Sequence, residues 1–199
     1  PANIFNSYEW GGYLQWHLFP AYKVFWDGRN TSQTTMTDGA AITNGDPGWS
    51  RSLEAHGINT VVIMPCALKE GRRFGIIKPL SETRDFALVY ADDFSLVFVR
   101  RKAVSKLWLL EHELPKQRIL DTILSMAILI AREDPRRHVP YFEMFRVFNV
   151  KGEHQKALQA LQTYLVKNPE QDPTGQRVYQ IYYNAIYGNK KQESVVRQE

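Results

Sequence analysis

The chain has 199 residues, of which 25 are Lys or Arg and 21 are Asp or Glu, so its formal charge is +4. This surplus is too small to drive nucleic-acid binding, which requires many clustered cations. Apolar residues make up 44% of the chain and aromatic residues 13%, which excludes global disorder. The length suits one or two domains with a real hydrophobic core.

The composition offers little support for metal, redox or nucleotide chemistry. Cys66 is the single cysteine, which excludes an internal disulfide and a multi-cysteine zinc site. None of the five histidines stands at the spacing of a metal-binding pair. Gly11 and Gly12 lie at an expected strand-to-helix turn, but no dinucleotide fingerprint accompanies them, so they favour a tight turn over phosphate binding. We therefore expect no cofactor.

Two regions of different character divide the chain. Charges balance over residues 1–115, and the whole basic surplus lies in the remainder. We predict an α/β domain over residues 1–103 and a helical domain over residues 104–199. The longest strongly apolar run, residues 123–131, is far shorter than the roughly 20 residues that cross a bilayer. The numbering starts at Pro1 without an initiator methionine, so we expect an excised piece of a longer protein.

The first region predicts a small sheet. Five runs have the composition of strands: residues 4–6, 23–26, 60–64, 86–90 and 95–99. An amphipathic stretch at residues 13–18 joins the first two runs into a βαβ unit, whose strands are parallel. The last two runs flank a turn at Asp92 and predict a hairpin. The fold class is therefore α/β, a small Rossmann-like sheet of about five strands, three parallel and a C-terminal hairpin.

The segments between these strands are less regular. Residues 30–48 are rich in Thr, Ser, Asn, Gly and Asp and predict a long exposed loop. A helix is expected to begin near Asp46 and Pro47 and to end at Gly57. Within the next connection, residues 76–80 are compatible with either a short helix or a loop.

The second region has helical periodicity throughout. Four helices are expected, around residues 117–133, 141–148, 157–165 and 173–186. Pro135 and Pro169 stand 34 residues apart, each after an apolar helix, and this is the period of the tetratricopeptide repeat. The region therefore resembles that family, although Phe145 and Tyr164 are larger than the residues that the family prefers. About one and a half to two repeats are expected, followed by a frayed tail from Asn189.

A second resemblance rests on several unusual residues that occur together and in order. They are residues 5–14, Pro20, residues 23–25, residues 27–29, residues 86–90 and residues 97–100. This set is similar to the soluble C-terminal domain of polytopic bacterial membrane proteins of the GT-C glycosyltransferase-like class. The resemblance covers residues 3–101 and leaves the segment at 30–48 unmatched.

The resemblance implies a location and a partner. It places the domain on the extracytoplasmic, periplasmic face of the bacterial inner membrane, attached to its own membrane-spanning portion and near a lipid-linked sugar pathway. The catalytic acid of such proteins is expected in the membrane portion. The resemblance therefore does not imply that this segment itself catalyses sugar transfer.

The ends of the first two strands hold the candidate ligand-binding residues. Glu9, Asp27 and Arg29 follow two strands expected to be parallel neighbours, and ligands of open α/β sheets bind beyond the carboxyl ends of strands. Trp10 and Trp26 nearby are candidates for stacking on a glycan. The alternative is that Asp27 and Arg29 form a local ion pair and that the tryptophans belong to the core.

Two other groups of side chains are candidates for partner binding. Four tyrosines of the last helix are spaced so that several share one helical face: Tyr179, Tyr182, Tyr183 and Tyr187. They are compatible with a protein or peptide site and equally with capping of the array or packing on the α/β domain. The basic triplet at residues 100–102 is compatible with contact to acidic lipid headgroups or with protection of a strand edge.

The sequence therefore predicts a non-catalytic accessory domain that binds a partner protein or a glycan near a membrane-embedded glycosyltransferase. The alternative is an independent carbohydrate-active enzyme in which Glu9 and Asp27 are the two carboxylates. Glycoside hydrolysis would require these carboxylates to face one cleft about 5–9.5 Å apart.

Overall fold

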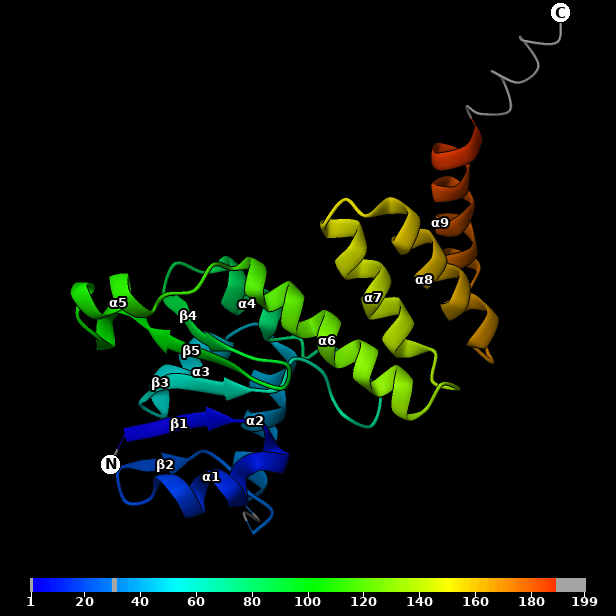
Figure 1. Cartoon of the computed structure of the whole chain (residues 1–199). Helices are drawn as coiled ribbons and strands as arrows, with labels where there is room; N and C mark the ends of the chain where they lie inside the picture. The colour runs from blue at the N-terminus through cyan, green and yellow to red at the C-terminus, as the bar shows by residue number, and fades with distance from the viewer. Residues whose placement is uncertain (1, 30–31, 189–199) are drawn as a thin grey trace, which may run out of the picture. The chain divides into compact units, whose positions relative to one another are not determined.

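The computed structural model describes residues 2–29 and 32–188 (Figure 1). The chain forms two compact units. The first unit comprises Pro1–Ala67 and Arg73–Thr122, and the second comprises Leu68–Arg72 and Ile123–Glu199. The first unit therefore continues past residue 103, where the character of the sequence changes.

A five-stranded mixed sheet forms the centre of the first unit (Figure 1). Its strands are β1 (Ala2–Asn6), β2 (Tyr22–Val24), β3 (Ile58–Ile63), β4 (Phe86–Ala91) and β5 (Leu96–Arg100). The order across the sheet is β2-β1-β3-β5-β4. The first three strands run parallel, whereas β5 pairs antiparallel with β3 and β4. The predicted α/β class with about five strands is thus confirmed.

One row of apolar side chains crosses the sheet and forms its core. Phe5 is paired with Val61, Val61 with Phe98, and Phe98 with Leu88. All four residues are buried. Side chains that oppose each other on neighbouring strands lie on the same face, so this row packs as one layer. The apolar runs at residues 61–63 of β3 and 96–99 of β5 follow from this position, since both strands lie inside the sheet.

The predicted loop at residues 30–48 is wrong, because α2 (Gln33–Asn44) occupies most of it. The Ser32 side chain accepts a hydrogen bond from the Thr35 N–H at the start of the helix. Gly45 ends the helix in the left-handed conformation, with φ of 70°. Only two of its residues, Gly39 and Ile42, are buried. Because α2 buries so narrow a face, its sequence is mostly polar and resembles that of a loop. The helix propensity of this sequence is weak, and tertiary packing stabilises the helix nevertheless.

Four further helices and two 3-10 turns complete the described part of the first unit. They are η1 (Tyr8–Trp10), α1 (Gly11–Leu18), α3 (Trp49–Ala55), α4 (Ile77–Glu82), η2 (Arg101–Ala103) and α5 (Lys106–His112). The helices expected before β2 and before β3 are confirmed as α1 and α3. At residues 76–80 the structure has a helix rather than a loop. The sequence analysis did not predict α5, which Ser105 caps by accepting a hydrogen bond from the Trp108 N–H.

The second unit is helical over its described residues. The division between the units falls inside α6 (Gln117–Glu133), and α7 (Val139–Val150), α8 (His154–Lys167) and α9 (Pro173–Tyr183) follow. A π-helical turn, η3 (Asn184–Gly188), continues α9. These elements confirm the four predicted helices, whereas the tail from Asn189 lies outside the described residues. Their shared core is Ala127, Ala131, Met144, Phe145, Ala157, Ala160 and Leu161.

A pair of glycine substitutions tests how tightly α2 packs on the first unit. A Cβ atom on Gly39 would lie 2.1 Å from the ring of Trp26, whereas a Cβ on Gly12 of α1 would meet nothing within 4 Å. Gly39→Ala should lower the free energy of unfolding by about 1–2 kcal/mol, since overpacking outweighs the gain in helix propensity. Gly12→Ala should raise it by up to about 1 kcal/mol. Urea denaturation of the two variants measures both values, and equal effects would contradict the packing.

Candidate functional site

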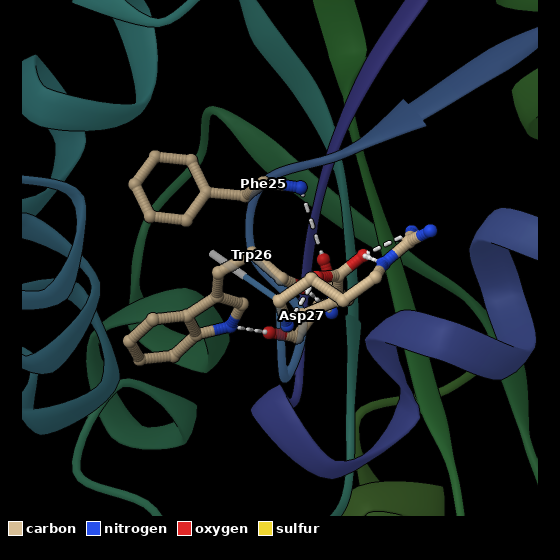
Figure 2. A network of polar contacts seen from close by, with 5 residues as sticks. Phe25, Trp26 and Asp27 are labelled. Carbon is tan, nitrogen blue, oxygen red and sulfur yellow. Dashed lines mark hydrogen bonds and ion pairs between the residues drawn. The ribbon is translucent and has the colours of Figure 1, made fainter. Parts of the chain in front are cut away.

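A buried amide joins the end of β1 to the segment after β2. Asn6 donates through Nδ2 to the carbonyls of Ser7, at 2.9 Å, and Trp26, at 3.0 Å. Its Oδ1 accepts from the Phe25 N–H at 3.1 Å. The Asn6 carbonyl in turn accepts from the indole Nε1 of Trp26 at 2.6 Å. Figure 2 shows the bonds of Phe25 and Trp26 in this network. The sequence analysis assigned Asn6 no role, although a polar residue that ends a buried strand is a recognisable signal.

Trp26 lies in the core of the first unit. Its residue is 7% exposed, and its ring lies edge-on to Tyr8, with 5.4 Å between the ring centroids. The Phe5 ring lies beside it, with 5.8 Å between the ring centroids, and Gly39 of α2 lies against the indole ring. These neighbours cover the indole, so it offers no open face for stacking on a sugar ring. The arrangement favours the core alternative for this tryptophan.

Asp27 and Arg29 form a local ion pair. Oδ1 of Asp27 accepts from the Arg29 N–H at 2.8 Å, and its Oδ2 accepts from Nη2 at 2.6 Å and from Nε at 3.2 Å. Asp27 is buried, whereas the Arg29 side chain is 76% exposed. The hydrogen bond that Arg29 donates to Asp27, followed by the negative charge of Asp27, raises the pKa of Arg29. The carboxylate thereby orders the loop after β2.

Glu9 and Trp10 do not join this network. Both lie in η1, where Glu9 is exposed and Trp10 is half-buried. Gly11 allows the first turn of α1 to approach residues 26–27, because a Cβ there would lie 2.2 Å from the Trp26 carbonyl. A glycosidase requires two carboxylates in one cleft. Asp27 instead uses both oxygens to bind Arg29, so this geometry does not favour the hydrolase alternative.

A groove in the second unit brings together three of the four predicted tyrosines. Tyr183 lies between Tyr179 and Tyr187 along α9 and η3, with ring centroids 6.1 and 5.1 Å away. The groove has a volume of about 580 Å³. Its other lining residues come from α8 and are Gln155, Lys156, Leu158, Gln159 and Gln162. Tyrosine rings and glutamine amides thus face each other across it.

Tyr182 points away from this groove. Its ring lies edge-on to Phe145, with centroids 5.6 Å apart, and its hydroxyl donates to Oδ1 of Asn149 on α7. Three of the four tyrosines therefore line a groove, whereas Tyr182 packs against α7. Phe145 thus provides the surface on which Tyr182 packs.

Asp172 and Tyr164 position α9 against α8. Asp172 caps α9 by accepting the Gly175 N–H at 2.8 Å, and its other oxygen accepts from the Tyr164 hydroxyl at 2.9 Å. Burial, followed by the hydrogen bond to Asp172, raises the pKa of Tyr164. This pair connects the end of α8 to the start of α9. Tyr164 therefore helps to hold α9 beside α8.

Residues 2–29 and 32–188 contain neither a metal-binding cluster nor a membrane-spanning helix. Within these ranges no group of three or more His, Cys, Asp and Glu side chains is arranged to hold a metal ion. No helix of the same ranges has the length and apolar character that crossing a bilayer requires. No family model, curated protein or solved structure matches the chain.

Asn6→Asp tests the buried amide. The introduced carboxyl replaces the Nδ2 donor and should lower the free energy of unfolding at neutral pH by about 3 kcal/mol, because two buried carbonyls lose their donor. A buried carboxyl beside two carbonyls has a raised pKa in the folded state, so the loss should shrink as the pH falls towards about 4. Asn59→Asp makes the same change at an exposed residue of β3 and should stay within about 0.5 kcal/mol. Chemical denaturation at several pH values distinguishes the two.

Proposed function

We propose that the chain is a non-catalytic binding module, whose groove between α8 and α9 holds an extended segment of a partner protein. The observation that carries this proposal is the row of three tyrosine rings facing the glutamines of α8. We further propose that α6 to α9 are tetratricopeptide-like and that the sheet is Rossmann-like. Helical arrays of this kind use grooves between successive helices for binding.

The chemistry of the groove suits a peptide. Tyrosine provides a large, rigid contact surface together with a hydroxyl, and it is enriched where proteins bind each other. Exposed glutamines both donate and accept hydrogen bonds, so Gln155, Gln159 and Gln162 match the unpaired N–H and C=O groups of an extended backbone. Lys156 is neutralised by Glu153 at 2.5 Å, so the groove carries little net charge. A segment with apolar or aromatic side chains is favoured over a highly charged one.

We also propose a setting for this module on the basis of the resemblance to GT-C glycosyltransferase-like proteins. In this proposal it is an extracytoplasmic domain attached to a membrane-spanning portion, and it holds its partner near the membrane. The catalytic acid would lie in the membrane portion. The buried Trp26 and the Asp27–Arg29 ion pair support a structural role for these residues.

Selection from a displayed library of random peptides tests the groove. Peptides selected on the intact chain should bind Tyr183→Ser and Tyr187→Ser at least about tenfold more weakly, because each substitution removes an aromatic anchor. Ile181→Ser is the matched control, since Ile181 is an exposed apolar residue of α9 that does not line the groove. Fluorescence anisotropy measures the affinities. Equal weakening by all three substitutions, or binding of glycans on an array with no peptide selected, would contradict the proposal.

The proposed setting has a separate test. The reading frame that encodes the chain should also encode, upstream, many apolar segments of about 20 residues each. Sequencing of the genomic locus establishes this directly. A reading frame without such segments would remove the membrane setting and leave the peptide groove unaffected.

A further inference from the structure

A cationic cavity lies at the end of β5 in the first unit. Its volume is about 300 Å³, and it is lined by Ser50, Glu54, Arg84, Asp85, Arg100, Arg101 and Lys102. Four of these side chains are cationic and two are carboxylates. All seven belong to the first unit, and none belongs to the peptide groove.

Arg100 is the unusual member of this group, because its charge is buried. Its residue is 4% exposed, and its guanidinium lies over the ring of Phe86, with 4.7 Å to the centroid. Nε and Nη2 are both buried, and neither hydrogen-bonds to any atom of the part of the chain that the structure describes. A buried cation with two unsatisfied donors is costly and requires an explanation. The interpretation of residues 100–102 as solvated edge protection does not account for it.

The fold leaves Arg100 no alternative position. Alternate residues of a strand share a face, so Arg100 lies on the same side as the buried Leu96 and Phe98. Phe86 is its direct partner on β4, and the Phe86 ring also contacts Trp49 of α3, with 6.1 Å between centroids. The sheet and α3 therefore hold the guanidinium in place.

Two of the neighbouring cations, Lys102 and Arg101, differ from Arg100 in having ion-pair partners. Lys102 pairs with Glu54 at 2.7 Å, and Arg101 pairs with Glu113 of the segment after α5. The hydrogen bond and charge of Lys102, followed by the charge of Arg100, lower the pKa of Glu54. Arg84 is exposed at the cavity. The pairing leaves the positive charges of Arg100 and Arg84 in excess over the single carboxylate of Asp85.

We propose that this cavity is a binding site for a phosphate group, with Arg100 as its anchor. Nε and Nη2 lie on one edge of a guanidinium and donate two parallel hydrogen bonds to adjacent oxygens of an oxyanion. A phosphate dianion offers further oxygens to Arg84 and to the Ser50 hydroxyl, which a monocarboxylate lacks. The ligand is inorganic phosphate or the phosphomonoester of a larger molecule.

Isothermal titration calorimetry of the intact chain with inorganic phosphate tests this site. At constant ionic strength phosphate should bind, whereas acetate should not. Arg100→Met keeps an unbranched apolar stem, although a shorter one, and removes the donors, so it should weaken binding about tenfold or more. Arg84→Gln changes an exposed residue, cannot disturb the core, and should weaken binding several-fold. Arg118→Gln removes an exposed cation of the same unit outside the cavity and should leave binding unchanged.

A second measurement separates the two sources of a phosphate group. Flotation with vesicles of phosphatidylcholine, with and without phosphatidic acid, reports binding to a lipid phosphomonoester. Binding to phosphatidic acid that is lost in Arg100→Met and Arg84→Gln supports the site with a lipid headgroup as ligand, even if free phosphate binds weakly. The proposal is overturned if neither source binds, or if the two cavity variants bind as well as Arg118→Gln.

Discussion

The first unit depends on the side-chain amide of Asn6. Strand β2 is short, and the segment that follows it is held by this amide and not by strand pairing. The strand ends at Val24, and beyond it the Phe25 N–H and the Trp26 carbonyl bond to the Asn6 side chain rather than to a neighbouring strand. The amide thus replaces the backbone hydrogen bonds that a neighbouring strand would provide. It satisfies the buried polar groups of residues 25 and 26 where the chain turns away from the sheet. Trp26 is thereby placed beneath α2, and Asp27 follows at the end of the sheet.

Local signals made much of the fold predictable. The hairpin is one example, since Asp92 accepts hydrogen bonds from the N–H groups of Phe94 and Ser95 and so defines the turn within four residues. The helix at residues 117–133 is another, because its apolar face follows a helical period. By contrast, α2 depends on contacts that are distant in sequence. Gly39 has a low intrinsic helix propensity, and no local pattern shows that the ring of Trp26 packs against it.

In the candidate sites, too, some features follow from local sequence signals and others only from contacts that are distant in sequence. Tyr179, Tyr183 and Tyr187 are each four residues apart, and helical spacing alone places them on one face. Tyr182 departs from that spacing and points towards Phe145, which only the packing of α7 against α9 reveals. Arg100 was treated as part of a charged triplet, although strand alternation from Phe98 already indicated that it faces inward. Predicting that Arg100 is buried would also have required the position of α3, whose Trp49 packs on Phe86.

Two buried charges in one small unit are stabilised in different ways. Asp27 receives its counter-charge two residues later from Arg29, through three hydrogen bonds to both carboxylate oxygens. This arrangement is complete within one loop and accounts for the presence of the carboxylate. Arg100 has the face of Phe86, but among the described residues its Nε and Nη2 have no acceptor. A ring face compensates a cation far less than a carboxylate does. A buried charge whose partner the chain itself supplies, such as Asp27, has a structural role. A buried charge without such a partner, such as Arg100, is suited to binding a ligand of opposite charge.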